Sequence, residues 1–232
     1  MSGSVVVIGG SSGLGKAIAA HYAGQGDEVV LTSRDGERAE SAAADIGGSV
    51  RGLAVDLARP HEIANGLTDV GSVLHLVVAA IERDENTVRD YDIEGAIYLS
   101  TLKLVGYTEV VHALVDRFTP DGSVVLFGGL AKERPYVGST TVSTVNGGIS
   151  TMINTMTVEL APLRFNAIHP AVVGDTPYWE EKPPEVLEAI RNRTPTGRLV
   201  TTAEIVHAVA FLLENGAVNG VNLVVDGGSL LG

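Results

Sequence analysis

Short runs of apolar and β-branched residues recur along the chain and are separated by longer stretches with helical periodicity. Several of these runs are apolar at consecutive positions, as strands must be when helices cover both faces of their sheet. Strands that alternate with helices in this way pair in parallel, because each connection crosses over the sheet. The predicted strands are residues 4–8, 28–32, 50–55, 73–78, 123–127, 164–168 and 220–225.

This pattern predicts an α/β fold, a single doubly wound Rossmann domain with a seven-stranded parallel sheet and helices on both faces. The domain is expected to span residues 1–232, because no change of composition, low-complexity tract or internal repeat divides the chain. A chain of 232 residues is long enough for one large core and short for two.

Two long helices are expected at residues 92–118 and 143–160, and both carry enough apolar surface to pack against another subunit. A cluster of prolines between residues 177 and 184 interrupts the alternation of strands and helices. We interpret this cluster as a loop or a lid, because proline disfavours both a helix interior and a central strand.

The composition excludes several classes of protein. A net charge of −12 argues against a nucleic-acid-binding surface, which needs clustered lysine and arginine. The absence of cysteine excludes disulfides and thiolate sites, and the scattered histidines form no chelating pair, so no metal site is expected. The longest apolar stretch, residues 73–81, is interrupted by His75 and is about half the length of a membrane-spanning helix. The first strand begins at Ser4, which leaves no room for a signal peptide, so we expect a cytoplasmic protein that binds no membrane.

A glycine-rich turn follows the first predicted strand and opens a helix. Its residues 9–15 read Gly-Gly-Ser-Ser-Gly-Leu-Gly. Glycines allow the backbone to turn sharply and to approach a ligand, while the amide groups and the positive end of the helix dipole attract phosphate. A tight structural turn is the alternative, but the strand before it and the helix after it favour a dinucleotide diphosphate.

The end of the second strand indicates which dinucleotide is bound. A domain specific for NAD usually places an acidic residue here, to bind the ribose hydroxyl groups, whereas this chain has Ser33 and Arg34. Arg34 can bind a 2′-phosphate and stack on adenine, so NADP(H) is favoured over NAD(H). Asp35 complicates this choice. Asp56, after the third strand, can bind the adenine amino group or cap the next helix.

With residues 166–170 (Asn-Ala-Ile-His-Pro) and residues 226–228 (Asp-Gly-Gly) added to the glycine turn, the chain resembles the short-chain dehydrogenases/reductases of the classical type over essentially its full length. The resemblance implies a homodimer or homotetramer paired through the two long helices. It also completes the expected set of cofactor contacts, which comprises Gly9, Ser11, Ser12, Gly13, Leu14, Gly15, Ser33, Arg34, Asp56, Leu57, Ala79, Ala80, Pro170, Val172, Val173 and Thr176.

The chain departs from this family at the residues that carry its chemistry, an Asn, a Ser, a Tyr and a Lys. In the family the tyrosine protonates the carbonyl, the lysine lowers the pKa of the tyrosine and holds ribose, and the serine positions the substrate. At the corresponding positions this chain has Asp92, Gly129, Val142 and Asn146. Valine has no proton to donate and asparagine carries no charge, so the usual proton relay is absent.

Three functions remain open. The first is an NADP(H)-dependent reductase with a nonstandard proton donor, because hydride transfer belongs to the cofactor and a general acid contributes only about 10²–10⁴-fold. The second is a catalytically inactive NADP(H)-binding protein that acts as a sensor or partner subunit. The third is a lyase or isomerase that uses the same cleft.

Candidate replacements for the proton donor lie after the fifth strand. Tyr136 is the only phenol there, and an aromatic wall of the pocket is the alternative role for its ring. The other candidates are Lys132, Ser139, Thr140, Thr141 and Ser143, followed by Asp92 and Asn146. From this set, the catalytic residues we predict are Tyr136, Asp92, Ser143 and Asn146. The expected pocket walls are Leu130, Tyr136, Val137, Val142, Tyr178 and Trp179, which indicate a small hydrophobic or cyclic substrate.

Overall fold

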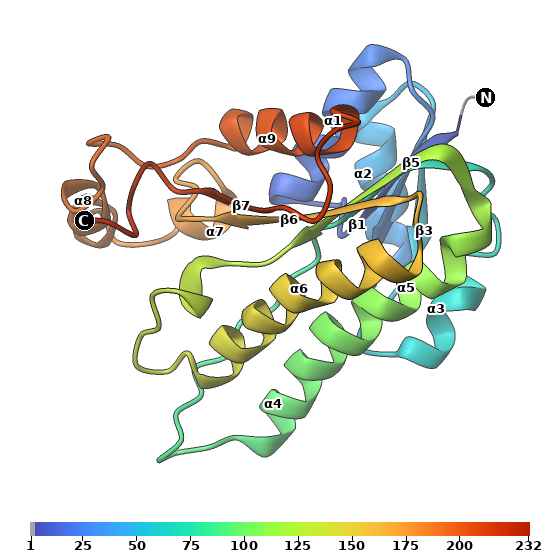
Figure 1. Ribbon diagram of the computed structural model, residues 1–232. Helices are drawn as coiled ribbons and strands as arrows, with labels where there is room; N and C mark the ends of the chain where they lie inside the picture. The colour runs from blue at the N-terminus through green and yellow to red at the C-terminus, as the bar shows by residue number, and fades with distance from the viewer. Residues whose placement is uncertain (1–2) are drawn as a thin grey trace.

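A computed structural model describes residues 3–232 and contains one seven-stranded sheet between two layers of helices (Figure 1). Its strands are all parallel and lie in the order β3-β2-β1-β4-β5-β6-β7, which confirms the predicted fold class. The strands are β1 (Ser4–Ile8), β2 (Val29–Ser33), β3 (Val50–Ala54), β4 (Val73–Val78), β5 (Phe118–Phe127), β6 (Arg164–Pro170) and β7 (Asn222–Val225).

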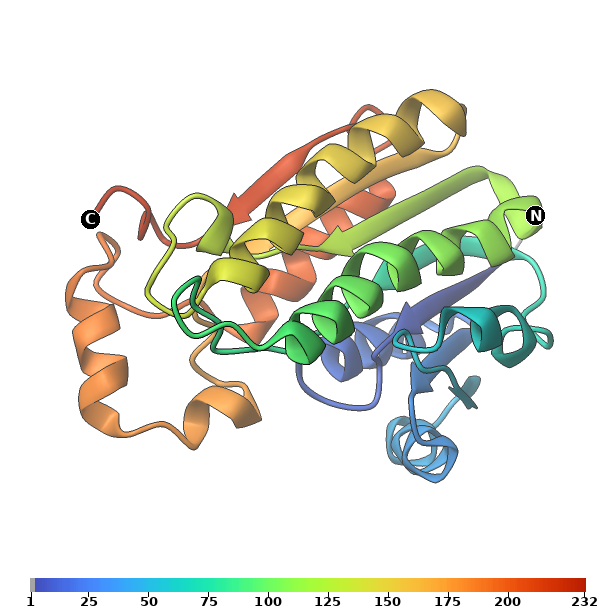
Figure 2. The same cartoon turned by 90° about the horizontal axis from the view of Figure 1, so that it is seen from below.

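Helices connect the strands and cover both faces of the sheet. They are α1 (Gly13–Gln25), α2 (Gly36–Ile46), α3 (Pro60–Gly66), α4 (Ile93–Ser100), the π-helical segment η1 (Thr101–Gly106), α5 (Tyr107–Leu114), η2 (Val115–Arg117), η3 (Leu130–Lys132), α6 (Thr140–Glu159), α7 (Pro177–Glu180), α8 (Pro184–Asn192) and α9 (Thr202–Glu214). The continuous α4–η1–α5 helix and α6 lie side by side across one face, and α7 and α8 lie beyond the ends of the strands (Figure 2).

The alternation of side chains along β1 shows how the two faces are built. Val5 and Val7 pack against α1, α2 and α9, whereas Val6 and Ile8 pack against α3, α5 and α6. All four side chains are at most 1% exposed. A strand apolar at every position is therefore explained by two apolar cores, one on each face of the sheet.

The structure differs from the sequence prediction mainly at element boundaries. Strand β5 begins at Phe118, earlier than predicted, and the predicted helix 92–118 is α4–η1–α5 followed by a short 3₁₀ turn. The segment predicted as a loop or lid instead contains the helix α7. Proline at the first turn of a helix is compatible with helical structure, because that position needs no intrahelical N–H donor.

The sheet reverses its strand order between β1 and β4. Chain connections run to opposite faces on the two sides of this point, so a crevice opens beyond the carboxyl ends of these strands. The glycine turn after β1 lies at this crevice.

Candidate functional site

A cavity of about 810 Å³ lies beyond the carboxyl ends of the strands. Every residue predicted to contact the cofactor lines it, from Gly9 in the glycine turn to Thr176 before α7. Two of the four predicted catalytic residues, Tyr136 and Asn146, also line it. One continuous space thus connects the predicted nucleotide and substrate positions.

The glycines of the turn serve different physical purposes. Gly9 has a φ of +81°, and a Cβ there would lie 2.7 Å from the backbone of Ala80. A Cβ on Gly15 would overlap the carbonyl oxygen of Gly9. Gly13 has a φ of +51°, yet a Cβ there would meet nothing within 4 Å. Gly9 and Gly15 are therefore required by packing, whereas Gly13 faces the open cavity.

The N-terminus of α1 leaves its amide groups available to a ligand. Ser12 is the N-cap residue, but its side chain makes no capping hydrogen bond. The first turn of α1 contains no acidic residue. Uncapped amide donors and the positive end of a 13-residue helix therefore face the cavity, an arrangement that binds phosphate.

Two arginines line the cavity at the end of β2. Arg34 donates a hydrogen bond of 2.9 Å to the Glu82 carboxylate and one of 3.3 Å to the Tyr98 hydroxyl. Glu82 follows β4, on the other side of β1, so this ion pair extends across the mouth of the crevice. Arg38, in the first turn of α2, also lines the cavity. It was not predicted from the sequence, although it follows Arg34 closely along the chain.

Asp35 and Asp56, the two acidic residues considered from the sequence, have local structural partners. The Asp35 carboxylate caps α2 by accepting a hydrogen bond of 2.8 Å from the amide of Arg38. The Asp56 carboxylate accepts a hydrogen bond of 2.9 Å from the amide of Ala58, although Asp56 also lines the cavity. Asp35 therefore caps its own helix and does not line the cavity, so its carboxylate would not repel a phosphate bound there.

The two residues predicted to stand at the family's serine and lysine positions, Gly129 and Asn146, are in contact. A Cβ on Gly129 would lie 2.7 Å from the Asn146 amide nitrogen, so the Asn146 side chain occupies the space that a serine would need. Asn146 is 3% exposed and its amide oxygen has no hydrogen-bond partner among the described residues. Val142, one turn earlier on α6, lines the cavity with an apolar surface.

His169 fixes the backbone behind these positions. Its Nδ1 accepts a hydrogen bond of 3.1 Å from the amide of Gly129, so the ring proton is on Nε2, which lies 2.9 Å from the Asn222 amide oxygen. Burial lowers the pKa of His169 and keeps the ring neutral. This histidine joins β5, β6 and β7 and has a structural role.

The structure removes two predicted catalytic residues from the site. Asp92 is the exposed N-cap residue of α4, and Ser143 donates its hydroxyl to the Ser139 hydroxyl at 2.9 Å; neither lines the cavity. Lys132 pairs with Glu133 at 2.6 Å. Helix geometry explains these corrections, because α4 begins at the protein surface and Ser143 lies on the side of α6 that is turned to the preceding loop.

The residues predicted as pocket walls line the cavity except for Val137, which is 94% exposed. Tyr178 and Trp179 of α7 pack edge to face, with ring centroids 5.2 Å apart. The guanidinium of Arg83 lies 4.1 Å from the ring centroid of Tyr178. Tyr136 lines the cavity but is 57% exposed, and burial of part of its ring raises its pKa. The end of the cavity beside α7 is therefore aromatic with a cationic edge.

A buried lysine at the cavity was also not predicted from the sequence. Lys103 of η1 is 3% exposed and lines the cavity, and its ammonium lies 3.5 Å from the Gly128 carbonyl oxygen. Burial, aided by the positive charge of Arg83, lowers the pKa of Lys103 to about 7. A sequence signal existed, since Lys103 falls on the buried stripe that also contains Leu99, Leu102, Gly106, Tyr107 and Val110.

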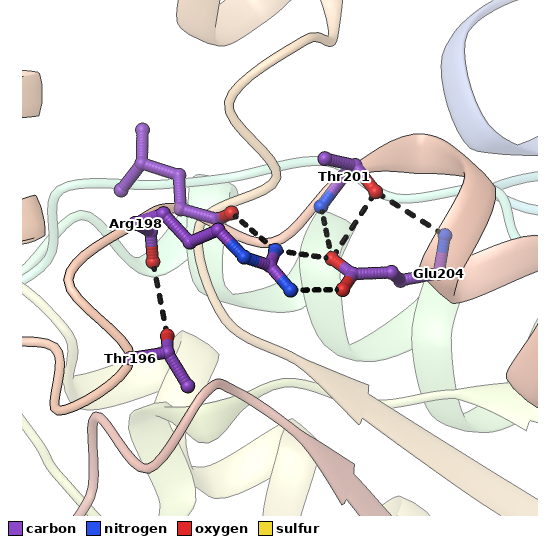
Figure 3. A network of polar contacts seen from close by, with 5 residues as sticks. Thr196, Arg198, Thr201 and Glu204 are labelled. Carbon is purple, nitrogen blue, oxygen red and sulfur yellow. Dashed lines mark hydrogen bonds and ion pairs between the residues drawn. The ribbon is translucent and has the colours of Figure 1, made fainter.

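Another arginine at the cavity has a structural partner (Figure 3). Arg198 donates hydrogen bonds of 2.9 and 2.6 Å to the two carboxylate oxygens of Glu204. Glu204 also forms the capping box of α9 with Thr201. The hydrogen bonds from Arg198 have the largest effect on the Glu204 carboxyl, and those from Thr201 add to it. Together these contacts lower the pKa of Glu204 to about 2. They fix the loop before α9, which forms one wall of the cavity.

Within residues 3–232, no cluster of three histidine, aspartate or glutamate side chains has the arrangement of a metal site. In the same range, none of the helices combines the length and apolar character required to cross a bilayer.

Comparison with known proteins identifies relatives over nearly the whole chain. The family model described as enoyl-(acyl carrier protein) reductase matches residues 8–229. The 3-oxoacyl-(acyl-carrier-protein) reductase of Homo sapiens is 32% identical over 231 residues, covering 96% of this chain and 95% of the relative. The L-xylulose reductase of Bos taurus is 30% identical over 238 residues, covering 97% and 95% of the two chains.

Solved structures share the fold. A short chain dehydrogenase/reductase family protein is 29% identical, with a TM-score of 0.88 and coverage of 99% of this chain and 97% of the other. A small-chain dehydrogenase in complex with NADPH is 23% identical, with a TM-score of 0.85 and full coverage of both chains. The second likeness concerns the fold alone.

Proposed function

This chain belongs to the short-chain dehydrogenase/reductase family, and we propose that it is an NADP(H)-dependent reductase of a carbonyl or similar group on a small hydrophobic substrate. The observation that carries this proposal is the charge arrangement of one cavity. The uncapped N-terminus of α1 suits a diphosphate, while Arg34 and Arg38 suit a 2′-phosphate. These separate positive regions match the separate phosphates of NADP(H).

The chain's own contribution is binding, orientation and exclusion of water. When bound, the reduced nicotinamide supplies the hydride. Aromatic residues of α7 cover the opposite end of the cavity and suit an apolar substrate. From this position α7 can exclude water from the site as a lid does. The relatives named above are reductases of oxygenated carbon compounds by their names, which supports reduction as the reaction class.

Trp179 provides a direct test because it is the only tryptophan and lines the cavity. NADPH is expected to change its fluorescence with saturation, and NADPH absorbance is expected to fall when quinones, cyclic ketones or aldehydes are added. Saturable binding with no oxidation across this panel would instead support an inactive binding protein. That second function has a specific observation in its favour, the replacement of the family's serine and lysine by Gly129 and Asn146. Absence of NADPH binding would contradict both functions.

The Arg34–Glu82 ion pair should compete with the cofactor. Glu82→Gln is expected to tighten NADPH binding, but by no more than about fivefold, because an exposed ion pair contributes at most about 1 kcal/mol. Isothermal titration calorimetry of NADPH measures this change. Glu133→Gln, which removes an acid outside the cavity, is the control. Weaker NADPH binding by Glu82→Gln would show that Glu82 assists binding.

We also propose that the protein is a homo-oligomer. Ile93, Ile97 and Val105 are 60%, 55% and 51% exposed, and all lie on the α4–η1 helix. Apolar side chains gathered in this way on one helix favour burial against another copy of the chain.

A further inference from the structure

A buried lysine reaches the cavity from an element that the family's usual proton relay does not use. The family's lysine is replaced by Asn146 on α6, whereas Lys103 enters from the facing helix. Its ammonium is next to the carbonyl oxygen of Gly128, which directly precedes the family's serine position. The cationic group is thus held at the same wall of the cavity but by a different element.

The π-helical segment explains how a charged side chain lies on the buried face of a long helix. Residues 101–106 form a widened turn, a distortion frequently found at functional sites. At its end, Gly106 packs closely on the backbone of Leu57, which leaves no space for a side chain there. The helix is thereby held close to the segment that follows β3, and Lys103 lies at the cavity wall.

The surroundings of Lys103 leave its N–H groups available to a ligand. An ammonium has three donors, and the Gly128 carbonyl oxygen at 3.5 Å is a long partner for one of them. The neutral ring of His169 lies on β6, and Arg83 adds positive charge from the loop after β4. Tyr107, on the same helix, has its ring centroid 5.9 Å from the ammonium, and its hydroxyl donates to the Ala80 carbonyl oxygen.

We propose that Lys103 is the proton donor of this reductase, an inference that rests on the proposed reductase function. When bound, NADPH would supply the hydride for the new C–H bond, and the carbonyl π electrons would move to oxygen. That oxygen takes a proton from the Lys103 ammonium, whose N–H electron pair remains on nitrogen. The products are the alcohol, NADP⁺ and a neutral amine, which regains its proton from water.

The comparison with Tyr136 favours Lys103. Tyr136 is more than half exposed, and partial burial of its ring raises its pKa, which makes the phenol a weaker acid at neutral pH. Burial has the opposite effect on the acidity of Lys103, because a desolvated ammonium gives up its proton more readily. A general acid is most effective when its pKa lies near the working pH.

Kinetics of four forms test the assignment: the wild type, Lys103→Met, Tyr136→Phe and Lys132→Met. Methionine keeps the length and apolar stem of lysine but has no proton to donate. We expect Lys103→Met to lower kcat by roughly 10²–10⁴-fold and to leave the NADPH affinity seen by Trp179 nearly unchanged. Lys132, which pairs with Glu133 and does not line the cavity, is the matched lysine control.

The pH profile separates a proton donor from a structural lysine. Because the ammonium is the donor, wild-type kcat/KM should fall tenfold per pH unit above about pH 7. This alkaline limb of the pH profile should be absent in Lys103→Met. If Lys103 were only structural, the substitution would lower the rate by the same factor at every pH. Retention of the limb, or loss of activity in Tyr136→Phe but not in Lys103→Met, would overturn the assignment.

A chemical measurement keeps the test independent of turnover. Acetic anhydride at limiting concentration, followed by mass spectrometry, compares Lys103 with the chain's other lysines, Lys16, Lys132 and Lys182. Lys103 should reach its limiting reactivity near pH 7–8, whereas ordinary lysines do so above about pH 10. NADPH should alter the reactivity of Lys103. The proposal would be overturned if Lys103 were unreactive or titrated like the other lysines. If Lys103 has a lowered pKa and responds to NADPH but no substrate is turned over, the failure lies in the proposed reductase function.

Discussion

Gly13→Asp is expected to weaken NADPH binding by about a hundredfold relative to Gly13→Asn. Gly13 has a positive φ and faces open cavity at the N-terminus of α1, so either side chain projects into the space assigned to the diphosphate. A carboxylate about 5 Å from a phosphate charge costs roughly 3 kcal/mol at the effective dielectric constant near a protein surface. It also neutralises the positive helix end on which binding depends.

The asparagine variant is a close control, because the two side chains have nearly the same size. Both tolerate a positive φ better than other non-glycine residues and share the same backbone cost. Their difference therefore reports charge. Fluorescence of Trp179 gives NADPH affinity, and thermal unfolding without cofactor checks that both variants fold. Equal affinities in the two variants would mean that the diphosphate lies elsewhere, and the proposed function would lose its main support.

The nucleotide half of the site could be predicted from sequence because its residues are continuous with the elements that hold them. Gly9 to Gly15 occupy a single strand-to-helix turn, and Ser33 and Arg34 end a strand whose position the apolar pattern defines. In a parallel sheet such strand ends converge on one edge. Local patterns therefore placed residues that are distant in sequence at one cavity.

The catalytic half could not be predicted in the same way, because it depends on which face of each helix meets the cavity. Asp92 and Lys103 belong to the same long helix, but only the second lies on its buried stripe. Alignment by motif pointed to the polar residue at the helix start. The periodicity of the helix, applied to its one buried cation, would have pointed to Lys103 instead.

The pairing of Gly129 with Asn146 was also invisible in sequence. The two residues lie on different elements, and only the structure shows that the asparagine amide fills the space beside the glycine. Gly129 and Asn146 therefore form one packed pair, in which the asparagine amide lies where a side chain on residue 129 would be.

Arg34→Ala is expected to weaken NADPH binding by about 10–100-fold and NADH binding by less than about threefold, because a charge-assisted hydrogen bond contributes about 1.5–3 kcal/mol and NADH lacks the 2′-phosphate. The loss should shrink at high salt, since Arg34 is exposed. Arg51→Ala, which removes a positive charge outside the cavity, is the control. Calorimetric titration with both nucleotides measures the ratio.

The ion pair with Glu82 makes the Arg34 test sharper. In Arg34→Ala the Glu82 carboxylate loses its partner and should repel the phosphate, so adding Glu82→Gln should recover part of the NADPH affinity. The double variant therefore divides the effect into lost attraction and gained repulsion. If Arg34→Ala weakens both nucleotides equally, Arg34 contacts adenine or ribose and not a 2′-phosphate. Arg38, the neighbouring cation at this cavity, would then be the remaining candidate for selecting NADP(H).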